Sequence, residues 1–304
     1  MYDILIIGGG PAGLTAAIYA LRAKKSCLMI EKFAPGGQVS LTSKIENYPG
    51  HKSIDGFGLS SLMFEQASEL GLEVVYSDVL EFDILGETKR VRTHEGEFEG
   101  KTIILCLGAS ARTLDVENEK RFLGRGLSYC ATCDGNFYKD KVVAVVGGGN
   151  TSFEDCVYLS NLASKIYLIH RRDEFRGDKS TLEKLREFEK EGKIEFVLNS
   201  VVKEIRGEEK LKSIVVENKF DKSCREIPVD GLFVAIGRKP DTSLLSGIIN
   251  LDENGYIITD ENMRTNIPGV YAAGDVRKKR LRQIVTACSD GAIASTDIVD
   301  YLSK

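Results

Sequence analysis

The sequence predicts an α/β protein with two Rossmann-like nucleotide-binding domains, the second inserted into the first. The first observation behind this prediction is a pattern of apolar strand, glycine turn and helix near the N-terminus, and the second is a copy of it 139 residues later. The third is that other apolar runs also end in glycine, which leaves room for a ligand. We expect residues 1–112 to begin the first domain, 113–243 to form the inserted domain, and 244–304 to complete the first.

Composition narrows the class of protein. Of the 304 residues, 42% are hydrophobic and 28% are charged, as in folded globular chains. The net charge of −4 gives no overall attraction for nucleic acid or an anionic membrane, so neither is expected as a partner. The apolar runs are far shorter than the roughly 20 residues of a membrane span, and no basic leader precedes the first. A cytoplasmic protein is expected.

The first copy of the pattern starts with the apolar run 3–7, which predicts a strand. A turn with Gly8, Gly10 and Gly13 follows, and apolar residues then recur at helical spacing. The second copy starts with the run 142–146 and continues into a turn whose corresponding positions are Gly147, Gly149 and Ser152.

Each position of the turn has a physical purpose. The first glycine permits a tight turn, the second lets backbone N–H groups approach a pyrophosphate, and the third lets helix and strand pack closely. Ser152 is small enough for the third position. The alternative is a pair of ordinary tight turns, but the agreement of two copies in register favours dinucleotide binding.

The next strand of each copy ends in a different residue type. The run 27–30 ends at Glu31, whose carboxylate suits ribose hydroxyls. The run 166–169 ends, 139 positions after Glu31, at a basic cluster that suits a 2′-phosphate: His170, Arg171, Arg172 and Arg176. The alternative is a solvated basic face, but its place after a phosphate turn favours the phosphate site. The two copies are therefore predicted to bind different nucleotides.

Other apolar runs complete the two domains. The runs 102–107, 232–236 and 270–273 each end beside a glycine, and the last of these glycines precedes Asp275. The more polar stretches 86–100 and 207–226 predict strand meanders and surface hairpins. The crossings between domains are expected at 112–114 and 240–242.

Two of the seven cysteines, Cys130 and Cys133, are separated by two residues and followed by Asp134. Half of a zinc site is one interpretation, but the other cysteines are scattered singly and no histidine cluster accompanies them, so no metal is expected. A redox dithiol needs two sulfurs close enough to bond, one of them with a lowered pKa, and a nearby acid that Asp134 can supply. We favour the dithiol.

Together these motifs resemble the bacterial low-molecular-weight thioredoxin reductases, over nearly the whole chain. The resemblance rests on the two glycine turns, Gly36-Gly37-Gln38, 46–50 (Glu-Asn-Tyr-Pro-Gly), 130–135 (Cys-Ala-Thr-Cys-Asp-Gly), the basic cluster at 170–176, Ala273-Gly274-Asp275 and Arg282-Gln283.

The resemblance implies FAD in the first domain, NADPH in the second, and a homodimer. FAD would be held by Gly8, Gly10, Gly13, Glu31, Gly37, Gln38, Asn47, Asp275, Arg282 and Gln283, and NADPH by Gly147, Gly149, Ser152, His170, Arg171, Arg172 and Arg176. It also implies that electrons pass from NADPH through FAD to Cys133, that Asp134 moves protons, and that Cys130 attacks the disulfide of thioredoxin.

Three positions depart from the family pattern. Asn150 replaces an acid, Ser152 replaces alanine, and Asn136-Phe137 replaces a pair of aromatic residues that line the thioredoxin groove. The partner implied by the resemblance is thioredoxin or a thioredoxin-like disulfide protein, and the alternatives are a glutaredoxin-like protein or a peroxiredoxin. A nucleotide sensor without turnover is a rival of another class, against which the cysteine pair argues.

Overall fold

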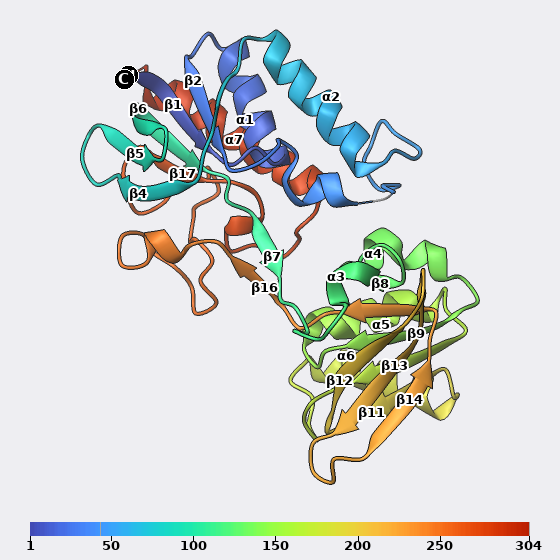
Figure 1. The fold of residues 1–304 in the computed structure, drawn as a ribbon. Helices are drawn as coiled ribbons and strands as arrows, with labels where there is room; N and C mark the ends of the chain where they lie inside the picture. Colours follow the sequence, from blue (N-terminus) through green and yellow to red (C-terminus); the bar gives the residue numbers. More distant parts are fainter. Residues whose placement is uncertain (43, 304) are drawn as a thin grey trace. The chain divides into compact units, whose positions relative to one another are not determined.

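The computed structural model describes residues 1–42 and 44–303, which form two compact units (Figure 1). The first unit contains Met1–Ser110 and the chain from Lys239 onward, and the second contains Ala111–Arg238. The chain thus passes into the second unit and back, close to the crossings expected from the sequence. The two crossings pair with each other as a two-stranded sheet of β7 (Ala109–Ala111) and β16 (Arg238–Pro240).

A seven-stranded sheet is the centre of the first unit. Five strands run parallel in the order β3-β2-β1-β6-β17, and β4 and β5 extend the sheet as an antiparallel hairpin on the first half of β6. The strands are β1 (Tyr2–Ile7), β2 (Cys27–Glu31), β3 (Glu73–Tyr76), β4 (Val79–Asp83), β5 (Lys89–Thr93), β6 (Gly96–Leu105) and β17 (Val270–Ala272).

Three helices cover one face of this sheet: α1 (Pro11–Arg22), α2 (Gly56–Glu69) and α7 (Ile284–Tyr301). Helices α1 and α7 approach closely because small residues face each other. A Cβ on Gly291 would lie 2.2 Å from the carbonyl oxygen of Ala12, and the Ser295 hydroxyl donates to the carbonyl of Ala16 at 2.7 Å. Among the described residues, no helix is both long and apolar enough to cross a membrane.

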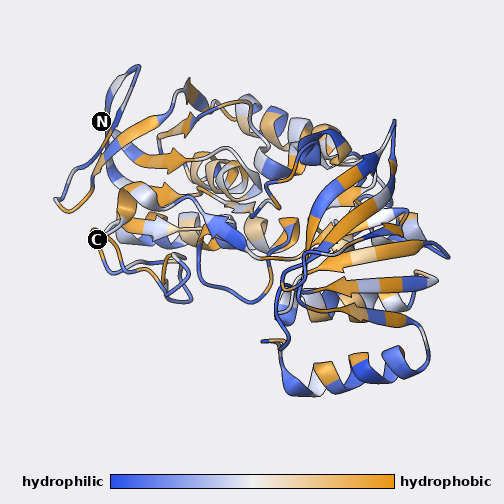
Figure 2. Ribbon diagram, turned by 60° about the horizontal axis from the view of Figure 1, so that its bottom comes forward, coloured by the Kyte–Doolittle hydropathy of each residue, from blue (hydrophilic) through white to orange (hydrophobic). Residues whose placement is uncertain are grey.

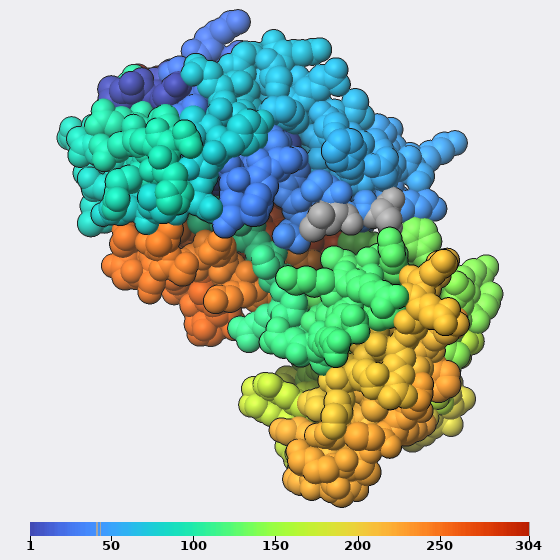
Figure 3. Space-filling model, viewed as in Figure 1, coloured from blue at the N-terminus to red at the C-terminus, as the bar shows by residue number. Residues whose placement is uncertain are grey.

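The part of the returning chain before α7, residues 239–283, is called the returning segment and covers the other face of the sheet. Leu245, Ile249 and Ile257 join the core that Leu5 and Ile7 of β1 reach from the opposite side of that strand. In the space-filling view this segment, drawn in orange, lies against the strands β4 and β5 (Figure 3). The segment includes the short 3₁₀ helices η3 (Ser243–Leu245) and η4 (Gly274–Val276), and η1 (Gly37–Leu41) precedes α2.

The second unit has a five-stranded parallel sheet in the order β11-β10-β9-β15-β8 and a three-stranded antiparallel sheet, β12-β13-β14. Its strands are β8 (Leu127–Ser128), β9 (Val142–Val146), β10 (Lys165–Ile169), β11 (Ile194–Val197), β12 (Ser200–Gly207), β13 (Leu211–Asn218), β14 (Cys224–Pro228) and β15 (Gly231–Val234). Its helices are α3 (Glu119–Phe122), α4 (Ala131–Asp134), η2 (Gly135–Tyr138), α5 (Asn150–Ser160) and α6 (Lys179–Lys190).

Both parallel sheets are buried on two faces, which explains their continuous apolar runs. Along β9, Val143 and Val145 face the helices α5 and α6, whereas Ala144 and Val146 face the antiparallel sheet. Hydrophobic residues accordingly follow the strands, and the loops are mostly hydrophilic (Figure 2).

The repeat seen in the sequence is a repeat of structure. Ile4 of β1 pairs with Cys27 of β2, and 139 positions later Val143 of β9 pairs with Ile166 of β10. The strand order β3-β2-β1-β6 in the first unit matches β11-β10-β9-β15 in the second. The predicted α/β fold with two Rossmann-type halves is confirmed.

Two strands differ from the predicted runs by two residues or more: β15 ends at Val234 and not at 236, and β6 differs at both ends. The apolar run 102–107 was expected to be a strand, but β6 starts at Gly96 and ends at Leu105. Its end is determined by pairing, because β1 ends at Ile7, the residue paired with Leu105. Its start lies earlier because residues 96–100 pair antiparallel with β5, within the stretch for which a hairpin was predicted.

Candidate active site

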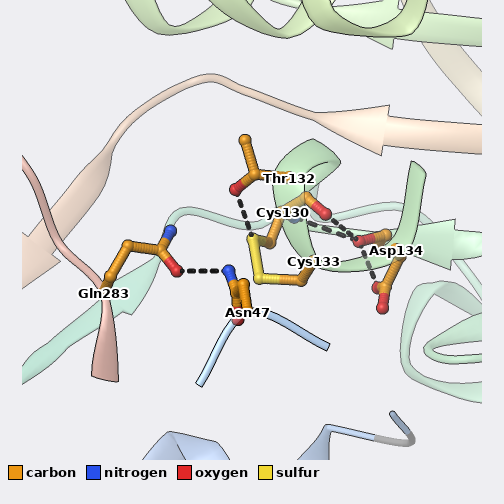
Figure 4. Close-up of a disulfide and its surroundings, with 7 residues drawn as sticks. Asn47, Cys130, Thr132, Cys133, Asp134 and Gln283 are labelled. Carbon is orange, nitrogen blue, oxygen red and sulfur yellow. Dashed lines mark hydrogen bonds between the residues drawn. A yellow bond between two sulfur atoms is a disulfide. The ribbon is translucent and has the colours of Figure 1, made fainter. Parts of the chain in front are cut away.

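The candidate active site in the second unit is built around a disulfide between Cys130 and Cys133, whose Cα atoms are 5.3 Å apart (Figure 4). The pair follows directly on β8, at the edge of the parallel sheet. Cys130 is the N-cap of α4, and its carbonyl accepts the N–H of Asp134 at 3.1 Å. A single helical turn therefore brings the two sulfurs together, and the predicted bond between them is confirmed.

A buried serine connects the disulfide to the acid beside it. Ser128 is 2% exposed, and its hydroxyl donates to Oδ2 of Asp134 at 2.6 Å and accepts the N–H of Cys130 at 3.0 Å. Sequence reasoning did not identify Ser128. A hydroxyl residue two positions before the first cysteine is the signal that was available.

Asp134 is in an environment that favours its protonated form. Its Oδ1 atom is buried and accepts no hydrogen bond from the residues that the structure describes. Burial raises the pKa of Asp134 above its ordinary value, and the hydrogen bond from Ser128 opposes this rise. The carboxyl can therefore hold and release a proton closer to neutral pH than an exposed aspartate, as a group that moves protons to and from thiols requires.

The two sulfurs have different neighbours. Oγ1 of Thr132 lies 3.5 Å from Sγ of Cys130, so its hydroxyl can donate to a thiolate there.

Two aromatic residues follow the second cysteine in η2. Phe137 is 40% exposed. Tyr138 packs edge-on against Phe233, and burial and the charge of Asp134 raise its pKa to about 12. Tyr138 thus stays protonated at neutral pH.

The three glycines of the turn in the first unit differ in the space around them. Gly8 has a φ of +104°, and a Cβ on it would lie 2.4 Å from the carbonyl oxygen of Cys106. A Cβ on Gly13 would lie 2.0 Å from the carbonyl oxygen of Gly8. No side chain fits at this position, and the helix therefore packs directly on the turn. A Cβ on Gly10 would meet nothing within 4 Å. The middle glycine therefore faces open space.

Glu31 and Gly37 lie beside this turn. The Glu31 carboxylate accepts the N–H of Gly9 at 2.5 Å and that of Phe33 at 2.9 Å. Gly37 is the first residue of η1 and has a φ of +55°. A Cβ on it would lie 3.3 Å from Cα of Gly10. Gln38 is the next residue of η1. The end of β2 and the start of η1 thus flank the glycine turn.

The other predicted residues are Asn47, which precedes α2, and three residues of the chain that returns from the second unit: Asp275, Arg282 and Gln283. The Asn47 side chain donates to that of Gln283 at 3.1 Å, although the two are far apart in sequence (Figure 4). Nε of Arg282 lies 3.4 Å from the carbonyl oxygen of Asp275, and the guanidinium lies 4.0 Å from the centre of the Tyr256 ring.

A buried carboxylate supports Asp275 from behind. Asp290 accepts the N–H of Gly274, the residue before Asp275, at 3.0 Å. It also pairs with Arg277 at 2.8 Å and with Lys279 at 2.7 Å. Sequence reasoning missed Asp290 because its role depends on α7 reaching the end of β17.

The turn in the second unit has the same arrangement. A Cβ on Gly147 would lie 2.5 Å from Cβ of Ser152, whereas a Cβ on Gly149 would meet nothing within 4 Å. Ser152 is fully buried, and its hydroxyl donates to the carbonyl of Gly149 at 2.7 Å. Serine therefore fits the third position by satisfying its own hydroxyl within the turn.

The basic cluster at the end of β10 separates into two kinds of residue. Arg171 and Arg176 are exposed and Arg172 is half-buried. His170 is only 8% exposed, and burial lowers its pKa. The positive charge at this strand end therefore comes from the three arginines, and His170 is a packing residue beneath the glycine turn.

A disulfide beside a buried acid, in a chain with two Rossmann-type halves, defines a nucleotide-dependent disulfide oxidoreductase. The described residues contain no group of three or more His, Cys, Asp or Glu residues that could hold a metal ion. A family model described as pyridine nucleotide-disulphide oxidoreductase matches residues 2–291. The chain belongs to this family.

Individual relatives are similar over their whole length. The chain is 44% identical to the thioredoxin reductase of Peptoclostridium acidaminophilum, over 99% of this chain and 97% of that protein. It is 42% identical to the thioredoxin reductase of Bacillus subtilis, over 100% of this chain and 96% of that protein. The crystal structure of the thioredoxin reductase of Streptococcus pyogenes is similar with a TM-score of 0.93 and 42% identity, covering 100% and 98% of the two chains.

Proposed function

We propose that the protein is a thioredoxin reductase that uses FAD and NADPH to reduce the Cys130–Cys133 disulfide, and through it the disulfide of thioredoxin. The observation that carries the proposal is this disulfide, with the buried carboxyl of Asp134 beside it. The full-length similarity to proteins named thioredoxin reductase supports the choice of partner.

FAD is the cofactor proposed for the first unit. The open space at Gly10 suits its pyrophosphate, the Glu31 carboxylate suits ribose hydroxyls, and η4 brings Asp275 to the same domain. Bound FAD and NADPH would supply the two electrons that the disulfide accepts. The protein's part is to position these groups and to move protons. The residues proposed to hold FAD are Gly8, Gly10, Gly13, Glu31, Gly37, Gln38, Asn47, Asp275, Arg282 and Gln283.

The cysteine pair first accepts two electrons and then passes them to the partner by thiol–disulfide exchange. Two electrons and two protons convert the disulfide to two thiols, with Asp134 as the group that exchanges a proton at Cys130 or Cys133. The Cys130 thiolate, beside the Thr132 hydroxyl, attacks the partner's disulfide and displaces one partner thiolate. Cys133 then attacks Cys130 of the mixed disulfide, so the internal disulfide forms again and the partner leaves with two thiols.

NADPH is the nucleotide proposed for the second unit, because three arginines follow β10. Each charge-assisted hydrogen bond to a 2′-phosphate is worth about 1.5–3 kcal/mol, roughly tenfold or more in affinity. Arg171→Ala and Arg176→Ala should therefore each lower kcat/KM for NADPH by about tenfold and leave that for NADH nearly unchanged. Steady-state kinetics with both coenzymes measure this. Equal kcat/KM values for the two coenzymes in the wild type would contradict the assignment.

An exposed aromatic residue close to the disulfide in sequence is the proposed contact for the partner protein. Phe137, 40% exposed near the disulfide, is the candidate anchor for a docked thioredoxin. A glutaredoxin-like protein or a peroxiredoxin is the alternative partner.

The homodimer implied by the family resemblance and the cytoplasmic location both stay predictions.

A visible spectrum tests the function. The purified protein should show flavin absorption that bleaches with NADPH and recovers when oxidised thioredoxin is added. Oxidised glutaredoxin and a peroxiredoxin are the comparison substrates. Recovery with one of these and not with thioredoxin would move the assignment to that carrier, and absence of bleaching would contradict the proposed electron path.

A further inference from the structure

The loop that carries the arginines is attached to the glycine turn at three points. We call residues 170–178 the arginine loop and residues 147–150 the phosphate turn. The ring of His170 lies directly beneath Gly148, where a Cβ would come within 2.2 Å of it. The N–H of Arg176 donates to the carbonyl of Gly148 at 2.7 Å. The N–H of Asp178 donates to the side-chain oxygen of Asn150 at 2.7 Å.

An aromatic cluster supports the arginine loop from below. The Phe175 ring stacks on His170, with ring centres 5.2 Å apart and planes 25° apart. It also meets the rings of Phe153 and Phe196 edge-on, at 5.4 Å and 5.1 Å. Phe153 is fully buried, and a Cβ on Gly177 would lie 2.3 Å from its ring. Phe175 thus sits at the centre of the contacts that hold this loop to the core.

The C-terminal end of the arginine loop is also held by hydrogen bonds. The Asp178 carboxylate accepts the N–H of Thr181 at 2.8 Å and caps α6. Because the N–H of the same residue is bound by Asn150, the first residue of α5, one hydrogen bond joins the starts of two helices. His170 also contributes, since its Nε2 lies 3.1 Å from the carbonyl oxygen of Glu174. The loop is therefore fixed at both ends and at its middle.

This attachment has a consequence for nucleotide selectivity. Arg171, Arg172 and Arg176 carry like charges within six positions, so they repel one another when no anion lies between them. The contacts that hold the backbone of the loop oppose this repulsion. A loop ordered in advance does not lose conformational freedom when the ligand binds, and its affinity is higher for that reason.

We propose that Phe175 and Asn150 are positioning residues that hold the arginine loop on the phosphate turn and thereby set the preference for a nucleotide with a 2′-phosphate. This inference rests on the NADPH site proposed above. Neither side chain needs to touch the nucleotide. Their effect acts through the arginines, so it should apply to the 2′-phosphate and not to the rest of the ligand.

The test uses two probes that differ only in the 2′-phosphate: 2′,5′-ADP and 5′-AMP. Binding of each to the full-length protein is measured by titration calorimetry. The wild type should bind 2′,5′-ADP at least about tenfold more tightly than 5′-AMP. Phe175→Ala and Asn150→Ala should each reduce this ratio by about fivefold or more, mainly by weakening 2′,5′-ADP.

Two matched variants separate positioning from general damage. Phe188→Ala removes the same atoms from the same hydrophobic cluster, but at the far end of α6, and should leave the ratio unchanged. Asn150→Asp keeps an acceptor for the Asp178 N–H and adds a charge beside the phosphate turn. Because 2′,5′-ADP carries more negative charge than 5′-AMP, the added charge should lower the ratio somewhat, but by less than Asn150→Ala does if the hydrogen bond to Asp178 is what matters.

The outcomes distinguish this inference from the proposed function. A wild type with no preference for 2′,5′-ADP would overturn the NADPH site and this inference with it. A wild type with the preference, and alanine variants whose ratio stays within twofold of it, would overturn only the positioning role. If thermal unfolding shows that Phe175→Ala does not fold, Asn150→Ala decides, because Asn150 is exposed and outside the core.

Discussion

Cys130→Ser and Cys133→Ser should each reduce disulfide turnover by at least about a thousandfold, which is the largest effect we expect from a single substitution. The reaction needs one sulfur to attack the partner and a second to release it, and the two are held in one helical turn with Cα atoms 5.3 Å apart. A serine hydroxyl neither forms nor re-forms a disulfide. Both variants should still pass electrons from NADPH to an artificial acceptor that takes them from the flavin.

The measurement is NADPH oxidation with thioredoxin and, separately, with the artificial acceptor. Cys224→Ser is the matched control, because Cys224 is a free, exposed cysteine in the same unit and should be dispensable. Retention of thioredoxin turnover in either variant of the pair would contradict the mechanism. Loss of turnover in Cys224→Ser would place an essential thiol elsewhere.

Asp134→Asn should have the second largest effect, a loss of about 10²-fold in turnover, which is typical when a general acid or base is removed. The buried Oδ1 atom and the raised pKa of Asp134 indicate that its carboxyl gives a proton to a thiolate. Turnover limited by this step should fall as pH rises through the pKa of Asp134. The variant should lose this pH dependence, and pH profiles of kcat measure it.

Ser128→Ala tests the same carboxyl from a distance. It removes the hydrogen bond that lowers the pKa of Asp134, so the alkaline decline of turnover should move to higher pH. Ser128→Thr keeps a hydroxyl and should restore the profile if its methyl group fits. An unchanged profile in Ser128→Ala would show that the carboxyl does not limit turnover.

The stability of Asp134→Asn should change in the opposite direction to its activity. The pKa of Asp134 is higher in the folded than in the unfolded chain, so the folded state binds the proton more tightly. Wild-type stability therefore falls as pH rises between the unfolded and folded pKa values, and is constant above the folded one. The gain from Asp134→Asn should grow over that interval, which denaturant unfolding at several pH values measures.

Much of the candidate site follows from local sequence. The glycine turns, Glu31 at the end of β2 and the arginines after β10 each lie within a few residues of a predicted strand, and the Cys130–Cys133 pair is recognised by its own spacing. Such features are readable because the apolar pattern of a strand, the glycine turn after it and the charge of a side chain depend on neighbouring residues. The 139-residue repeat adds that the two units share the same strand–turn–helix–strand arrangement, since two copies of one motif fold alike.

The sequence by itself thus determined the α/β class, the two glycine turns at the ends of parallel strands, and the two cysteines that form the disulfide. Only the tertiary structure decided that Ser128 holds Asp134, that Asp290 holds the turn before Asp275, and that His170 is buried under Gly148 while the arginines stay outside. The reason is physical. Charge and residue type are local properties, whereas burial and hydrogen-bond partners depend on segments that meet only when the chain has folded.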